Sequence, residues 1–375
     1  MDYFLDIKLV ECPLIVAKGC HFLAPIPRDS TVLYLAAVRA WTRIAYQERR
    51  EHQEIDMALF LNDQEVAQLL PMGECIDVLD KAFADAGEGK VDNRPRNRIR
   101  MPGGFFHFMT ASNAGQGVFG YKAYPSFGGP GSAKMIVMLY DYETGGLLSC
   151  MEAGRLGQIR TGAASGVATK YMAKEDAAIV AVIGSGFQAR TQLEAVCSVR
   201  DIKAVKVFSR REERREEFAK RSSESLNVEV KAVDSAQECV GGADVVIVIT
   251  SAREPALLGE WLSPGAHINA AGGNHWMRRE IDEEAVLRSE VIVVDDLDQA
   301  KIECGDLLWL EPRGSFRWDM AKELQDVVAG RVQGRPSANS ITLFESMGLA
   351  LEDIAAAQLV YTKAKEQGIG EKLPF

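Results

Sequence analysis

The stretch AAIVAVIGSGFQARTQLEA, residues 177–195, decides the fold of this chain. Its apolar run, residues 177–183, predicts a strand that is buried on both faces, as in a parallel sheet. Gly184, Gly186 and Ala189 then fit the pattern G-x-G-x-x-G/A, whose small residues let the backbone approach a pyrophosphate. The stretch therefore predicts a strand, a turn and a helix that bind a dinucleotide, with Ser185, Phe187 and Gln188 also lining the turn.

After this turn the chain alternates apolar runs with polar, helix-like segments. The expected strands are AVKVFS, VEVKAV, DVVIVIT, AHINAAG and VIVVDD, and the segments between them include EERREEFAKR and SAQECVGG. Strands that alternate with helices predict a parallel sheet covered on both faces. We therefore expect an α/β fold whose doubly wound, Rossmann-type domain spans residues 157–321.

The segment before residue 157 has a different pattern. LFLNDQEVAQLLP predicts a short strand and a helix capped by Asn62 or Asp63, and a second helix is expected over residues 73–86. Residues 135–152 place two strands around a Thr-Gly-Gly turn, which predicts a β-hairpin. Residues 340–368 combine a strand-like start with a long amphipathic helix, which we expect to return to this first part of the chain.

Composition limits the classes of function. The chain has 375 residues, 47% hydrophobic content and a net charge of −10, so it offers no basic surface for nucleic acid. Its 7 cysteines are scattered, odd in number and without a C-x-x-C pair, which favours reduced thiols inside the cell and argues against a zinc site. We found no apolar run long enough to span a bilayer and expect a cytoplasmic protein whose partners are small molecules and other subunits.

Residues 1–56 form an N-terminal extension of unknown role. Residues 31–54 have an apolar first half and a charged second half, a pattern compatible with an amphipathic helix or an interfacial anchor. A peripheral extension is the favoured interpretation.

The residues at the end of the second expected strand indicate whether the cofactor is NAD(H) or NADP(H). Sheets that bind NAD usually carry Asp or Glu there for the ribose 2′-hydroxyl, whereas this chain has Ser209, Arg210 and Arg211. Because an arginine can grip a 2′-phosphate that a carboxylate would repel, NADP(H) is favoured and NAD(H) remains possible. The alternative is that the arginines begin a solvated, charged helix. Thr250 ends the strand DVVIVIT, where such folds contact the nucleotide.

Four motifs in this order resemble the ornithine cyclodeaminase/mu-crystallin family. They are GQIRTGAASGVATKYMA, IGSGFQARTQLEA, GEWLSPGAHINAAGG and VVDDLDQAK, and the resemblance extends from Ala58 to the C-terminus. It implies a homodimer with a Rossmann-type domain and a split α+β domain, residues 57–156 and 322–375, for substrate binding and dimerisation. The family includes cyclodeaminases, alanine dehydrogenases and imine reductases.

The resemblance also implies roles for single residues. Lys122, in the element G-x-K, matches the lysine that meets the substrate carboxylate and transfers a proton. Arg96, or Arg98 in another register, matches the arginine that meets the same carboxylate. Arg160 matches an arginine at the cofactor diphosphate, with an interdomain salt bridge as the alternative, and Ser346 matches a further cofactor contact.

Two positions depart from relatives within the family. His107 stands near the place where alanine dehydrogenases carry an arginine; it is a candidate for the substrate pocket, or else a packed core histidine. Asn274 replaces the aspartate of cyclodeaminases, and an amide cannot accept a proton as a carboxylate does. The motif DDLD, residues 295–298, resembles a metal cluster, but we expect a solvated loop and no metal site.

We therefore expect an NAD(P)H-dependent oxidoreductase that acts on a C–N bond of a small amino or imino acid, most plausibly by reducing an imine. Lys122 and Asn274 are the catalytic candidates. The alternatives are a cyclodeaminase-like lyase with bound NAD, an alanine dehydrogenase-like enzyme, and a non-enzymatic binding protein regulated by NADPH.

Overall fold

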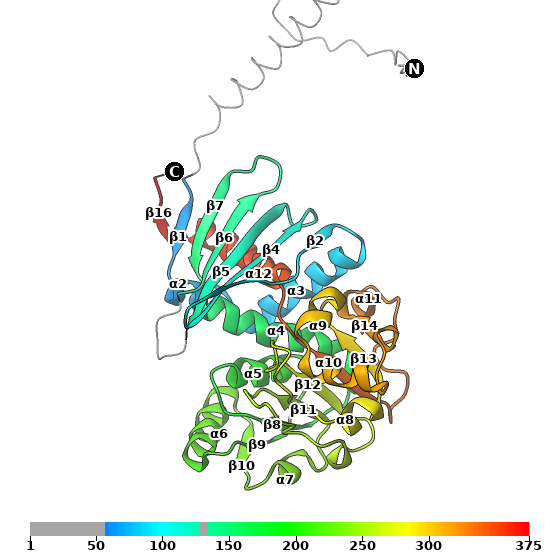
Figure 1. Ribbon diagram of the computed structural model, residues 1–375. Helices are drawn as coiled ribbons and strands as arrows, with labels where there is room; N and C mark the ends of the chain where they lie inside the picture. Colours follow the sequence, from blue (N-terminus) through cyan, green and yellow to red (C-terminus); the bar gives the residue numbers. More distant parts are fainter. Residues whose placement is uncertain (1–56, 128–133, 375) are drawn as a thin grey trace, which may run out of the picture. The chain divides into compact units, whose positions relative to one another are not determined.

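Two sheets of eight strands each organise the computed structural model, which describes residues 57–127 and 134–374 (Figure 1). The N-terminal extension, with its expected amphipathic helix or anchor, lies outside the described residues. No helix in the described residues is long and apolar enough to cross a membrane.

The first sheet is mainly antiparallel and has the order β16-β1-β7-β6-β5-β4-β2, with β3 paired to β4. Its strands are β1 (Leu59–Leu61), β2 (Val91–Asn93), β3 (Asn97–Met101), β4 (Gly104–Asn113), β5 (Val118–Phe127), β6 (Ile136–Asp141), β7 (Leu147–Glu152) and β16 (Glu371–Lys372). β6 and β7 confirm the expected hairpin.

Three helices belong to this first sheet: α2 (Asp63–Leu69), α3 (Met72–Gly87) and α12 (Ala350–Gln367). Asn62 caps α2, since its side chain accepts hydrogen bonds from the backbone of Gln64 and Glu65. α12, drawn in red in Figure 1, packs against β4, β5 and β6. A Cβ on Gly120 of β5 would meet Ile354 of α12 at 3.3 Å, so this strand lies close to the helix.

The second sheet is wholly parallel and has the order β10-β9-β8-β11-β12-β15-β13-β14, which confirms the doubly wound fold. Its strands are β8 (Ile179–Ile183), β9 (Ala204–Phe208), β10 (Glu229–Ala232), β11 (Val245–Val248), β12 (His267–Ala270), β13 (Ser289–Val294), β14 (Ala321–Glu323) and β15 (Ile341–Glu345).

Helices connect these strands. They are α4 (Gly154–Met172), α5 (Ala189–Val199), α6 (Glu212–Leu226), α7 (Ala236–Val240), α8 (Glu283–Arg288), α9 (Leu297–Glu303), α10 (Gly305–Leu310) and α11 (Leu324–Val328), with short 3₁₀ turns η1 (Gly259–Trp261), η2 (Glu311–Arg313) and η3 (Trp318–Met320). α4 contacts α3 and α12 as well as α5 and β12, so it bridges the two sheets.

The expected boundary at residue 322 is wrong. β15 lies between β12 and β13 in the second sheet, and all five of its residues are buried. The chain therefore returns to the first sheet after Glu345. The sequence did not reveal this because a short apolar run without a glycine turn fits either sheet.

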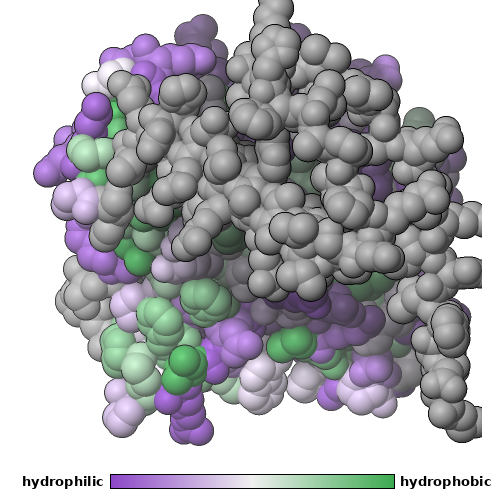
Figure 2. All heavy atoms as spheres, turned by 90° about the horizontal axis from the view of Figure 1, so that it is seen from above, coloured by the Kyte–Doolittle hydropathy of each residue, from purple (hydrophilic) through white to green (hydrophobic). Residues whose placement is uncertain are grey.

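The order of strands reverses beside β8, which pairs with both β9 and β11. In open α/β sheets such a reversal opens a crevice at the carboxyl ends of the strands, where ligands bind. The face seen in Figure 2 interleaves hydrophilic and hydrophobic residues wherever grey atoms do not cover it. The strand order thus predicts a ligand site in the crevice of the second sheet.

Candidate active site

A cavity of about 1040 Å³ lies at the carboxyl ends of β8, β9, β11, β12 and β15 and reaches β5 of the first sheet. It brings together most of the residues expected from the sequence. They are Arg96, Lys122, Arg160, Gly184, Ser185, Gly186, Phe187, Gln188, Ser209, Arg210, Thr250, Asn274 and Ser346. Arg98 and His107 are not among its lining residues.

The glycine turn lies at the end of β8. Gly184 has φ +116°, and a Cβ there would meet the carbonyl oxygen of Ile249 at 2.3 Å, so only glycine fits. The side-chain amide of Gln158 in α4 donates a hydrogen bond to the carbonyl oxygen of Phe187. Ser185 donates from its hydroxyl to Ser209 at 2.8 Å, which ties the turn to the end of β9.

Three exposed arginines, Arg210, Arg211 and Arg214, line the cavity beside this turn. Their guanidinium groups make no hydrogen bond or ion pair with the described residues. Arg215 differs, because it is buried and pairs with Asp234 at 2.6 Å. Three cations that face the cavity without partners favour the interpretation as an anion-binding site over the interpretation as the start of a solvated helix. Sequence reasoning missed Arg214, which lies in the first turn of α6, shortly after Arg210 and Arg211.

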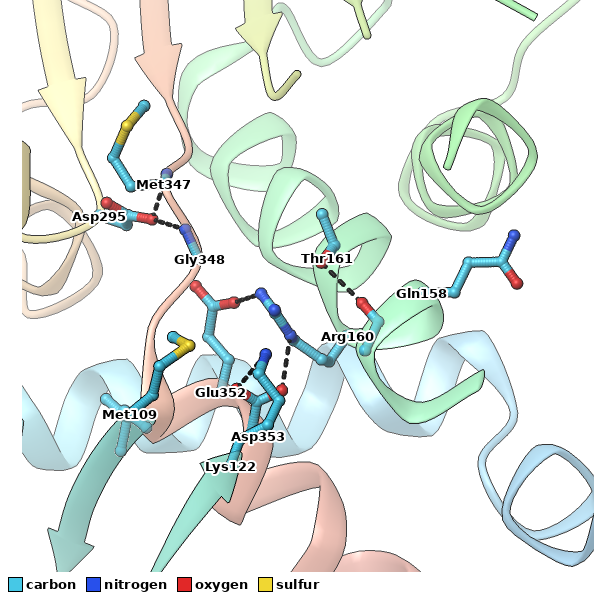
Figure 3. Close-up of polar contacts among 12 residues, drawn as sticks. Met109, Lys122, Gln158, Arg160, Thr161, Asp295, Met347, Gly348, Glu352 and Asp353 are labelled. Atoms are coloured by element: carbon cyan, nitrogen blue, oxygen red, sulfur yellow. Dashed lines mark hydrogen bonds and ion pairs between the residues drawn. The ribbon is translucent and has the colours of Figure 1, made fainter. Parts of the chain in front are cut away.

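Lys122 of β5 is buried at the other end of the cavity, where its Nζ lies 2.7 Å from Oδ2 of Asp353 in α12 (Figure 3). Burial and the nearby charge of Arg160 lower the pKa of Lys122 to about 8, although Asp353 acts in the opposite direction. The lysine can therefore change its protonation state near neutral pH.

Arg160 of α4 lies beside Lys122 (Figure 3). Its Nε donates to Oδ1 of Asp353 at 2.9 Å and its Nη1 donates to Oε2 of Glu352 at 2.6 Å. Burial opposes the charge, but Asp353 and Glu352 outweigh it and raise the pKa of Arg160. These contacts agree with the expected alternative of a salt bridge between the two parts of the fold. The diphosphate contact expected of Arg160 stays a prediction; at the glycine turn, the side chain of Gln158 donates a hydrogen bond to the backbone.

Arg96 has most of its donors occupied. Its Nη1 pairs with Oε2 of Glu303 at 2.5 Å, while its Nη2 donates to the carbonyl oxygens of Met347 and Gly348 at 2.9 and 3.1 Å. Arg98 pairs with the other oxygen of Glu303, also at 2.5 Å. Two arginines thus share one buried carboxylate, and Arg96 holds the loop between β15 and α12.

Asn274 lies in the loop after β12, and its carbonyl oxygen accepts a hydrogen bond from Nη2 of Arg98 at 3.0 Å. The residue is exposed and lines the cavity. Arg98 therefore acts from behind the cavity wall, where it joins β3 to the loop that carries Asn274.

His107 stacks on Tyr124 with ring centroids 4.4 Å apart, and its Nε2 hydrogen-bonds the hydroxyl of Ser126 at 2.7 Å. Burial and the charge of Arg98 lower its pKa to about 4. Since Tyr124 lines the cavity and His107 does not, the histidine supports the ring from behind, as the packed-core alternative predicts.

The solvated-loop interpretation of the DDLD motif is wrong for its first residue. Asp295 is buried, and its Oδ2 accepts hydrogen bonds from the backbone N–H groups of Met347 and Gly348 at 2.6 Å each (Figure 3). Asp296 caps α9 by accepting from Gln299. Across residues 57–127 and 134–374, no group of three or more His, Cys, Asp or Glu residues is arranged to hold a metal ion.

The geometry of this site agrees with comparisons to known proteins. The pattern of the ornithine cyclodeaminase/mu-crystallin family matches residues 57–368. The chain belongs to this family. It is 39% identical over 241 residues to a Δ1-pyrroline-2-carboxylate reductase of Bacillus cereus, an alignment that covers 64% of this chain and 74% of the relative.

Solved structures of the family show the same fold. Δ1-pyrroline-2-carboxylate reductase of Thermococcus litoralis, in complex with NADH and L-proline, is 37% identical with a TM-score of 0.80, covering 84% of this chain and 100% of that one. An archaeal alanine dehydrogenase dimer with bound NAD is 33% identical with a TM-score of 0.79, covering 85% and 99%.

The residues of this chain fit a nicotinamide dinucleotide. Gly184 leaves the backbone of the turn accessible, and three unpaired arginines face the adjoining part of the cavity. Ser346 is buried at the other end, and its hydroxyl has no partner in the described part of the chain. A polar group buried without a partner is costly, which favours a bound ligand as its partner.

Proposed function

We propose that the chain is an NADP(H)-dependent reductase of a small imino acid, such as a cyclic ketimine carboxylate. The observation that carries this proposal is the buried Lys122, which has a pKa of about 8 and lies with Arg160 in a cavity that also fits a nicotinamide cofactor. The bound cofactor would supply a hydride from C4 of its nicotinamide.

The substrate carboxylate is held by Arg160 and Lys122. Nη2 of Arg160 makes no hydrogen bond with the described residues, because its contacts use Nε and Nη1. Nζ of Lys122 has donors left beside its contact with Asp353. Arg96, the residue expected from the sequence, has its Nη1 paired with Glu303 and its Nη2 occupied by two carbonyl oxygens, so it mainly shapes the loop around Met347.

Lys122 also donates the proton that the imine nitrogen needs. A protonated imine accepts hydride readily, and a donor whose pKa lies near the working pH both gives up and regains its proton. Asp353 favours the charged, proton-bearing form of Lys122, whereas burial and Arg160 favour the neutral form. The balance between these effects makes Lys122 suitable as the general acid.

The preference for NADP(H) rests on Arg210, Arg211 and Arg214. Their guanidinium groups face the cavity at the end of β9, where the 2′ position of the ribose is expected in this fold. Since none is neutralised by a carboxylate of the described residues, a 2′-phosphate gains charge-assisted hydrogen bonds there.

We propose that the outer face of the first sheet is the interface of a homodimer. An aromatic row crosses it, with ring centroids 5.0 Å apart for Phe108 and Tyr121, 6.4 Å for Tyr121 and Tyr140, and 5.1 Å for Tyr140 and Phe119. Phe108 is 37% exposed. The other three rings are half-buried. Aromatic side chains on an accessible sheet face are typical of interfaces, and the archaeal alanine dehydrogenase relative is a dimer.

A panel of imino acids, formed from 2-oxo acids and amines or by cyclisation of 2-oxo acids that carry a terminal amine, tests the proposed function at fixed NADPH. We expect NADPH to be consumed in equal amount to the amino acid formed, and no ammonia to be released from ornithine or lysine. Asn274→Asp is the matched variant, since it restores a carboxylate that can accept a proton. Ammonia release by the native protein would show a cyclodeaminase, and neither activity would leave a binding protein.

A further inference from the structure

Glu280 joins the ends of two neighbouring strands behind the cavity wall. It is 1% exposed and follows the loop that carries Asn274. Its Oε1 accepts hydrogen bonds from the backbone N–H of Thr250 at 2.5 Å and from the hydroxyl of Thr250 at 2.7 Å. Its Oε2 accepts from the backbone N–H of Gly272 at 2.5 Å. One carboxyl group thus fixes the chain just beyond β11 and just beyond β12.

The two strand ends that Glu280 holds form part of the cavity wall. Thr250 and Gly272 both line the cavity. A Cβ on Gly272 would meet the nitrogen of Thr250 at 2.5 Å and Oε1 of Glu280 at 2.6 Å, so no side chain fits between them. The carboxyl group therefore lies directly behind the surface that a ligand would touch.

The position of this wall corresponds to the nicotinamide end of the site. The glycine turn after β8 and the arginines after β9 suit the phosphates and the adenosine. The crevice continues on the other side of β8 past β11 and β12, toward Lys122 and Arg160. A dinucleotide that crosses the crevice from the glycine turn would place its nicotinamide on that side, near the strand ends that Glu280 joins.

The hydrogen bonds favour a charged Glu280. The hydroxyl of Thr250 accepts from the backbone N–H of Ala252 at 3.1 Å, so its own proton points to Glu280, and all three contacts are donated to the carboxyl group. Burial and the neighbouring Asp306 oppose this charge and raise the pKa to about 8, while Thr250 and Gly272 lower it. Glu280 is therefore ionised above about pH 8, and a positive charge on the cavity side would extend the ionised form to lower pH.

We propose that Glu280 is a positioning residue whose negative charge also stabilises the oxidised nicotinamide relative to the reduced one. The oxidised ring carries a positive charge that the reduced ring lacks. A fixed carboxylate behind the ring therefore favours the state that forms as hydride leaves for the imine. This inference rests on the proposed binding of a nicotinamide cofactor in the cavity.

Titration of the full-length protein with NADP⁺ and with NADPH above pH 8, where Glu280 is ionised, tests the inference without turnover. We expect Glu280→Gln to weaken NADP⁺ binding about tenfold more than NADPH binding, the order expected for one unit charge acting across a short, water-poor distance. Glu280→Asp keeps the charge and should keep the native ratio of the two affinities. Glu284→Gln, an exposed neutralisation in α8, should change neither affinity.

The outcomes separate the inference from the proposed function. An equal loss of both affinities in Glu280→Gln would show that Glu280 only positions the two strand ends. No change in either affinity would refute both the positioning role and the electrostatic role. A native protein that binds neither form would refute the proposed cofactor instead. Should Glu280→Gln not fold, Glu280→Ala replaces it in the same two titrations, because water can then reach the donors of Thr250 and Gly272.

Discussion

Replacing Asp353 by asparagine is the most direct test of how this site controls its proton. The substitution keeps Oδ1, which accepts from Nε of Arg160 at 2.9 Å. It replaces Oδ2, which lies 2.7 Å from Nζ of Lys122, by an uncharged amide nitrogen. The charge next to Lys122 is thus removed while the size of the side chain and its contact with Arg160 are retained.

The size of the effect follows from the causes of the present pKa. Burial and Arg160 hold the pKa of Lys122 at about 8, below its ordinary value of 10.5, and Asp353 is the main influence that raises it. Since an opposite charge at contact distance shifts a pKa by about 1–3 units, Asp353→Asn should lower that of Lys122 by this amount. Each unit corresponds to about 1.4 kcal/mol of lost preference for the ammonium form.

The sign of the pH dependence is then fixed. If Lys122 donates the proton, kcat for imine reduction falls as the pH rises through its pKa, near 8 in the native enzyme. In Asp353→Asn this fall should begin about 1–3 pH units lower. Because the folded-state pKa of Lys122 lies below 10.5, the free energy of unfolding should rise with pH between about 8 and 10.5, and over a wider window in the variant.

The assay is kcat against pH at saturating NADPH and imino acid, with thermal unfolding as the check on folding. Glu352→Gln is the matched control, since it removes a buried carboxylate of the same network that accepts a hydrogen bond from Arg160 rather than from Lys122. It should move the fall in kcat less than Asp353→Asn does. A folded Asp353→Asn enzyme with the native pH profile would show that Lys122 is not the proton donor.

Three further predictions follow from the site and the sheet. Arg210→Ala and Arg214→Ala should each weaken NADPH binding about tenfold and leave NADH binding unchanged, which nicotinamide fluorescence measures; equal losses for both cofactors would refute the 2′-phosphate site. Lys122→Ala should lower kcat by about two to four orders of magnitude without changing cofactor affinity, whereas near-native turnover would exclude the lysine from the chemistry. Tyr121→Glu should convert the dimer to a monomer in analytical ultracentrifugation, because it buries an unpaired charge in the aromatic row; an unchanged mass would place the interface elsewhere.

The doubly wound sheet could be predicted because its strands are buried on both faces and therefore read as continuous apolar runs. β11, residues Val245–Val248, is wholly buried and stands between turn-forming segments, so its pattern is unambiguous. β15 has the same wholly buried pattern but comes late in the chain, after a long irregular stretch. Its place between β12 and β13 depends on pairing with distant strands, and no local pattern encodes that pairing.

The carboxylates of the site could not be predicted for a related reason. Glu352 and Asp353 stand in the first turn of α12, where acidic residues are expected simply because they stabilise the start of a helix. Their partner Arg160 lies 193 residues away from Asp353 in the sequence. Lys122 was identifiable, because a lysine within an apolar strand is costly to bury unless it is paired. Its partner Asp353 could not be identified, because that contact depends on the packing of α12 against β5.

The balance of charge explains why the substrate should be an anion. Around the substrate end, the cations Arg96, Arg98, Lys122 and Arg160 contact the carboxylates Glu303, Glu352 and Asp353. Arg96 and Arg98 share Glu303, so the one positive charge that the carboxylates do not neutralise lies at this pair, of which Arg96 lines the cavity. Burial and the nearby Glu352 raise the pKa of Asp295 well above its usual range, which disfavours a further negative charge beside this network. Since an unpaired charge in a buried site is costly, a substrate carboxylate completes the network as well as orienting the imine.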